Sequence, residues 1–122
     1  KDALKEIAAK GGKVVITTDH GSIKVTEPIN VVGDKTVNTN LRYKQGKNLG
    51  YDEGDVFAIH EPAKAFLPKV NVSQSYIFAR GADFFAYPNN YNYYVNYYRN
   101  TFQHGGISME EMIVPLVHLS PK

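Results

Sequence analysis

One stretch decides the fold: KVVITTDHG at residues 13–21. It begins with a short apolar, β-branched run, which predicts a buried strand. The run ends in an acid, an imidazole and a glycine, and Gly21 allows the backbone to turn sharply there. In open parallel sheets, ligands bind beyond the carboxyl ends of the strands. We therefore expect Asp19 and His20 to lie where an α/β protein carries its chemistry.

The composition indicates one domain, or part of one, in 122 residues. With 43% hydrophobic and 21% charged residues, the chain can form a core. The net charge of +2 argues against a broad basic face for nucleic acid but permits a local anion site. The absence of cysteine excludes thiolate metal sites and cysteine nucleophiles, and it is compatible with the cytoplasm. No apolar run approaches the ~20 residues of a membrane span.

The segment before the opening stretch predicts a helix over residues 1–10, with apolar residues at helical spacing. Two glycines end this helix, and the apolar strand follows at once. Helix, turn and strand make half of a βαβ crossover. Because the chain opens at Lys1 in a helical pattern, we take it to be a piece of a longer protein.

Short strands and loops follow along the chain. The polar, basic segment 38–47 predicts a loop, and Glu27-Pro28 predicts a turn. A final strand lies at a sheet edge or begins after Pro115, because proline cannot donate to a ladder. The other expected elements are strands over residues 22–25, 29–32, 56–59, 75–79 and 83–87 (the last two paired with each other), a helical turn over 61–66 and a short helix from Ser108.

A helix is predicted over residues 89–100, where Tyr91, Tyr94, Val95 and Tyr98 follow helical spacing. The spacing favours a core-facing stripe whose hydroxyls lie at the wet margin. A platform on which bases or sugars stack is the alternative.

A second histidine signal is His104, which is followed by two glycines. Together, Asp19, His20 and His104 offer one oxygen and two nitrogen donors, which suits zinc, with manganese or iron possible. Glu110 and Glu111 belong to an S-x-x-E capping box, and we expect them to be structural.

Basic residues in the segment 38–47 offer a phosphate contact. Arg42 and Lys44 are the candidate substrate-binding residues. A solvated basic loop is the alternative, and the composition favours it.

Three blocks carry a family resemblance: TVNTNLRYKQG at residues 36–46, DFFAYPNNYNYY at 83–94 and TFQHGGISMEEMIVP at 101–115. With D-H-G ahead of H-G-G, they resemble the alkaline phosphatase superfamily. Within it they resemble the PglZ domain at the C-terminal end of PorX-type response regulators. The resemblance covers essentially the whole chain.

The resemblance implies an α/β three-layer sandwich around a mainly parallel sheet, with two metal ions at its carboxyl edge, usually zinc. Asp19 and His20 would bind the metal that also holds the nucleophile, and His104 would bind the other. The implied activity is phosphodiesterase cleavage of oligonucleotides through a threonine or serine nucleophile.

The resemblance also implies that residues 1–122 are the C-terminal part of one PglZ domain. The nucleophile and the other metal ligands belong upstream, since neither Thr18 nor Thr101 occupies the nucleophile position. We therefore expect this part alone to be inactive. The implied parent is a cytoplasmic, homodimeric two-component regulator of type IX secretion with a receiver domain. The alternative is a non-catalytic module that binds nucleic acid, a glycan or a protein.

Overall fold

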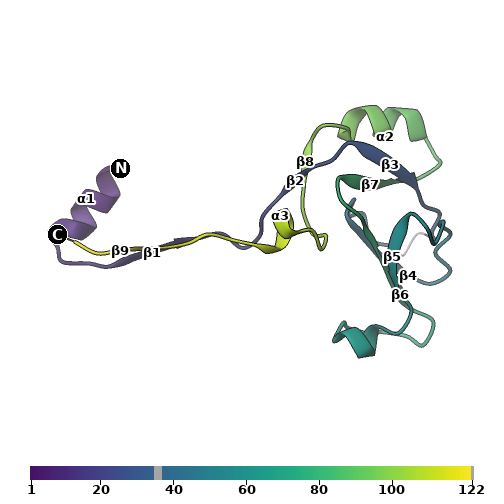
Figure 1. Ribbon diagram of the computed structural model, residues 1–122, viewed down its shortest axis with the longest axis horizontal. Coiled ribbons are helices and arrows are strands. Elements are labelled where there is room, and N and C mark those ends of the chain that lie inside the picture. Colours follow the sequence, from purple (N-terminus) through teal and green to yellow (C-terminus); the bar gives the residue numbers. More distant parts are fainter. Residues whose placement is uncertain (35–36, 122) are drawn as a thin grey trace.

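The computed structural model describes residues 1–34 and 37–121 and has two parts, an extended arm and a larger body (Figure 1). The arm is a helix, α1 (Asp2–Ala9), and an antiparallel ladder of β1 (Val14–Thr17) with β9 (Leu116–Leu119). Both chain termini lie at its far end (Figure 1). The predicted first helix and last strand are confirmed, and β9 begins after Pro115.

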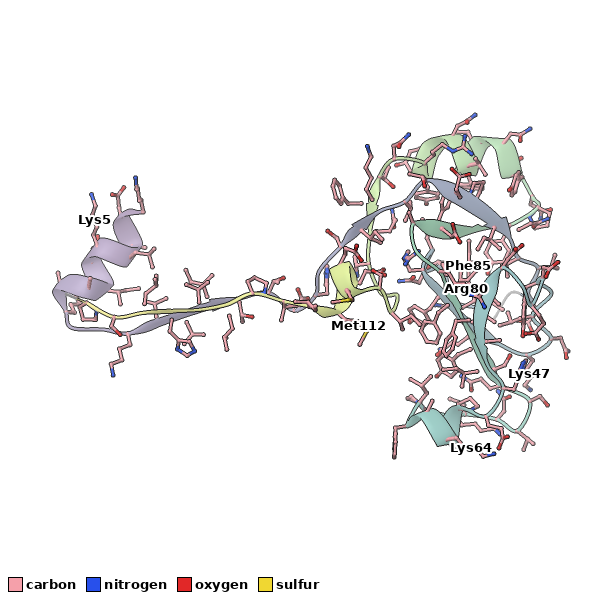
Figure 2. All side chains as sticks on the ribbon, viewed as in Figure 1. Lys5, Lys47, Lys64, Arg80, Phe85 and Met112 are labelled. Atoms are coloured by element: carbon pink, nitrogen blue, oxygen red, sulfur yellow. The ribbon has the colours of Figure 1, made fainter. Side chains whose placement is uncertain are left out.

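The arm leaves apolar side chains exposed. Ile16 and Val117 pair across the ladder, and they are 45% and 44% exposed. Side chains on both sides of the ladder point into open space (Figure 2). The strand in the opening stretch is therefore confirmed as a strand, but its predicted burial is wrong for this structure. The apolar pattern predicts which side chains favour burial, but it does not predict which part of the protein packs on them.

The body contains a parallel strand pair between a helix and a small sheet (Figure 1). The helix packs on one side through Val95, and the sheet lies on the other through Ile77. The parallel pair is β3 (Glu27–Asn30) with β7 (Asp83–Ala86), the helix is α2 (Tyr91–Tyr98), and the antiparallel sheet has the order β4 (Tyr43–Gly46), β6 (Ser75–Ala79), β5 (Val56–Ile59).

Strand β7 joins two hydrophobic clusters. Phe84 and Ala86 pack with Val95 of α2, while Phe85 packs with Ile77 of β6. Alternate residues of a strand point to opposite faces, so β7 places one aromatic ring in each cluster. Phe85 lies within the body (Figure 2).

The junction between arm and body carries the loops of interest. Here β2 (Ile23–Lys24) pairs antiparallel with β8 (Phe102–Gln103), and the short helix α3 (Met109–Met112) lies beside them (Figure 1). A 3-10 turn, η1 (Pro62–Ala65), lies at the predicted position in the body. No helix in the described ranges is both long and apolar enough to cross a membrane.

Several predictions of local structure are wrong. The segment 38–47 contains a strand, β4, and Glu27-Pro28 lies inside β3. Strand β7 pairs with β3 and not with β6. Polar composition misled the first prediction because polar atoms of β4 find partners inside the protein: the Lys44 ammonium donates to the carbonyl of Asn38.

The chain is an α/β protein, but its sheets are small and mostly antiparallel. Among the described strands, only β3 and β7 form a parallel pair. The mainly parallel three-layer sandwich is not confirmed by this arrangement.

Candidate metal centre

Two loops bring the predicted histidines together. His20 follows β1 and His104 follows β8, at the junction of arm and body. Their imidazole rings stack with centroids 3.8 Å apart and planes within 10°. The structure thus joins the D-H-G and H-G-G motifs, which lie far apart in the sequence.

Hydrogen bonding fixes the tautomer of His20. Its Nδ1 lies 2.7 Å from the carbonyl oxygen of Gly21. A carbonyl oxygen only accepts, so Nδ1 carries a proton, and in the neutral imidazole Nε2 is then the nitrogen with the free lone pair. This Nε2 lies 3.7 Å from a carboxylate oxygen of Asp19. Both side chains are solvent-accessible, so their donor atoms can reach a ligand.

Glycines allow the D-H-G loop to pack closely on α3 and the loop after His104 to turn. The Gly21 N–H donates to the Glu111 carbonyl at 2.8 Å, and a Cβ at Gly21 would overlap the carbonyl oxygen of Glu110. Gly105 has a φ of +97°, which a side chain would strain. The D-H-G loop therefore lies directly against α3, and the loop after His104 makes its turn at glycine.

Glu111 is the buried carboxylate that organises this junction. It accepts hydrogen bonds from the Arg42 guanidinium at 3.0 and 2.9 Å, and from the Gly106 N–H at 2.9 Å. Burial raises the pKa of Glu111, but hydrogen bonds from Arg42, Ser108 and Gly106 outweigh it and leave the pKa below its usual value. The expectation that Glu111 is structural is confirmed.

Arg42 lies inside the protein, with no exposed surface. Besides the two bonds to Glu111, its Nη1 donates to the carbonyl of Asp83. A solvated basic loop is therefore the wrong description. The guanidinium holds the H-G-G loop through Glu111 and would have to leave that carboxylate to reach a substrate phosphate, so its position favours a structural role over substrate binding.

Lys44 is also buried, at 1% exposure. Its Nζ donates to the Asn38 carbonyl at 2.9 Å and lies 4.6 Å from the centre of the Tyr87 ring. Burial lowers the pKa of Lys44 to about 8. The residue borders a cavity beside α2 and not the two histidines.

Asn40 also belongs to the junction, although no sequence pattern predicts it. The Asn40 side chain donates to the His104 carbonyl at 3.2 Å, and its own oxygen accepts the Arg42 N–H at 2.7 Å. No motif marks this asparagine, because a side chain that buttresses a loop leaves no spacing pattern. The remaining histidines are exposed: His60 contacts Glu53 at the surface, and His118 lies on the open arm.

The donor set fits part of a metal centre. A carboxylate and two imidazoles suit zinc, and the His20 Nδ1–H bond to a carbonyl is the usual support of a metal-binding imidazole. The stack brings one imidazole from each motif to the same place, as a site with a ligand from each loop requires. In the part of the chain that the structure describes, no group of three or more His, Cys, Asp or Glu side chains is placed to hold a metal ion.

Comparison with known protein families finds a match over nearly the whole chain. The model of the family described as BREX system PglZ alkaline phosphatase-like domain matches residues 1–119. No curated protein matches the chain significantly. The three resemblance blocks fall within the matched range, although Thr36 of the first block lies outside the described residues.

Proposed function

The chain belongs to the PglZ family of alkaline phosphatase-like domains, and on this basis we propose that it is part of a metal-dependent phosphodiesterase. The substrate class is a phosphodiester such as an oligonucleotide. Asp19 and His20 bind one metal and His104 binds the other, with zinc as the metal and manganese as the alternative. The stack of His20 on His104 is the observation that carries the proposal.

The metals, when bound, would clamp phosphate oxygens, activate the nucleophile and stabilise the leaving group. The chain's own residues supply the framework. Gly21 N–H and Gly106 N–H both bond to Glu111, the first to its carbonyl and the second to its carboxylate, so one residue holds both histidine loops. Asn40 anchors the carbonyl of His104. These bonds orient the two imidazoles before any ligand arrives.

The remaining ligands and the nucleophile come, in this proposal, from a preceding part of the same domain. The arm supports this. The face of the β1–β9 ladder with Ile16 and Val117 is apolar and at least 44% exposed. The opposite face adds exposed Val15 and Leu116 beside the polar Thr17 and His118. A contiguous exposed apolar surface usually marks a face that another part of a protein covers. Without the missing ligands, residues 1–122 alone are inactive.

For the parent protein we propose the type that the family resemblance implies. The domain follows a receiver domain in a cytoplasmic, homodimeric PorX-type regulator of type IX secretion. Sedimentation of the intact protein, with and without receiver phosphorylation, measures the dimer directly.

The site is tested with His104→Ala in the intact protein, compared with His60→Ala. His60 is an exposed histidine far from the junction in sequence, and it contacts Glu53 at the surface. Losing a residue around a metal ligand already costs about 10- to 100-fold, so losing a ligand should cost more than ~100-fold in hydrolysis of bis-p-nitrophenyl phosphate. Bound zinc, measured by elemental analysis, should fall in parallel. Full activity and full zinc content in His104→Ala would overturn the assignment.

A further inference from the structure

A cavity beside α2 lies outside the proposed metal centre. Its volume is about 380 Å³, within the range of small-ligand sites. Lys44, Phe85, Tyr87, Tyr94 and Tyr98 contribute to its lining. Neither histidine of the D-H-G and H-G-G loops borders it.

Lys44 gives this cavity a buried positive charge. The ion pairs found among residues 1–34 and 37–121 do not include Lys44, and the nearby Asp34 carboxylate acts on Tyr87, whose pKa is raised by burial and then by that charge. An ammonium has three N–H donors, and here one of them bonds to the Asn38 carbonyl. The ammonium also lies 4.6 Å from the centre of the Tyr87 ring, so its contacts are a carbonyl and an aromatic face. Buried charges are normally paired with an opposite charge, which an anion in the cavity would supply.

Tyrosine rings give the same cavity flat walls. Tyr94 and Tyr98, one helical turn apart on α2, stack with centroids 6.2 Å apart. The neighbouring pair, Tyr93 and Tyr97, stacks in the same way but does not border the cavity and is more than 60% exposed. The helix therefore presents two tyrosine pairs, of which one borders the cavity.

We propose that this cavity binds a planar aromatic ligand that carries one anionic group, the chemistry of a nucleoside monophosphate. The anion pairs with Lys44, and the ring lies against Tyr94 and Tyr98. Tyrosine faces stack on bases with little sequence preference, and a lysine ammonium suits a phosphate. No metal enters this recognition, so it stands apart from the proposed phosphodiesterase.

Calorimetric titration of the intact protein with AMP tests this site, with EDTA present throughout. Lys44→Met should weaken AMP binding about 10- to 100-fold, as expected for the loss of a charge-assisted contact. Lys47→Met is the matched control, because Lys47 is exposed at the edge of the body (Figure 2), and it should leave binding unchanged. Adenosine and inorganic phosphate, titrated separately, should each bind more weakly than AMP.

A second pair of variants keeps the test decisive if Lys44→Met does not fold. Tyr94→Leu should weaken AMP binding about 5- to 100-fold, the usual effect of losing a stacked aromatic ring, whereas Tyr97→Leu should not. The His104→Ala variant should bind AMP normally in EDTA. The proposal is overturned if AMP does not bind at millimolar concentration, if Lys44→Met and Lys47→Met bind equally, or if His104→Ala abolishes binding. A failure of the metal centre alone leaves every one of these readouts unchanged.

Discussion

Arg42 and Glu111 form a fully buried two-pronged ion pair, with Nε–Oε1 and Nη2–Oε2 distances of 3.0 and 2.9 Å. The pair joins the segment before β4 to the helix after His104. Through its carbonyl and carboxylate, Glu111 also holds Gly21 and Gly106. A pair in this position connects the body to both loops of the candidate metal centre.

Glu111→Gln should destabilise the protein by about 3–5 kcal/mol, because it leaves the Arg42 charge buried and uncompensated. Urea unfolding of the intact protein measures this loss. The exposed pair of Lys64 with Glu61, at 2.8 Å, supplies the control. Glu61→Gln should cost less than about 1 kcal/mol, since solvent screens that pair. Equal losses in the two variants would contradict the role given to Glu111.

The same pair predicts a loss of stability in acid. Hydrogen bonds hold the pKa of Glu111 below its ordinary value of 4.5 in the folded protein. A carboxyl whose pKa is depressed by folding stabilises above its unfolded pKa, and this contribution is lost as pH falls through the folded pKa. The stability difference between the natural protein and Glu111→Gln should therefore be constant above about pH 5 and shrink below about pH 4.5. A difference that grows in acid would reverse the sign and refute the argument.

Gly21→Ala should disturb the D-H-G loop without touching a ligand. Its Cβ would overlap the Glu110 carbonyl, so the loop must move away from α3. We expect a loss of about 1–3 kcal/mol, the usual effect of overpacking, and weaker zinc binding in the intact protein. Gly50→Ala is the control, because its Cβ would meet Val32 at an ordinary 3.4 Å. Unchanged stability and zinc content in Gly21→Ala would mean that the loop is free to shift.

The sequence predicted the helices and most strands because their patterns are local. α1, α2 and α3 all lie inside or at the predicted segments, and α1 ends just before Gly11-Gly12 as predicted. Pairing could not be predicted in the same way. Strand β7 is as compatible with β6 as with β3 by composition, and only its alternating contacts with two clusters decide its place.

The candidate site could be predicted only as residue types. D-H-G and H-G-G marked Asp19, His20 and His104 by chemistry, and the structure stacks the two imidazoles. The burial of Arg42 and Lys44 could not be predicted, because a basic side chain in a polar segment normally remains exposed to water. Their partners, Glu111 and the Asn38 carbonyl, are brought close by tertiary packing.

The stability of the protein should increase at high pH because of the buried Lys44. Burial lowers its pKa from 10.5 to about 8 in the folded protein. Between these values the unfolded chain binds more protons than the folded one, so stability rises with pH, by about 3 kcal/mol in all. Below pH 8 the buried charge opposes folding, so Lys44→Met should be more stable than the natural protein there.

Urea unfolding from pH 7 to pH 10.5, comparing the natural protein with Lys44→Met, isolates this contribution from the tyrosines that titrate in the same range. The advantage of Lys44→Met should fall as pH rises through 8, while Lys47→Met should track the natural protein throughout. Saturating AMP at pH 7 should reduce that advantage, because its phosphate gives the Lys44 ammonium a partner. If the two profiles run parallel from pH 7 to 10.5, the ammonium is not desolvated, and the case for an anion beside it fails as well.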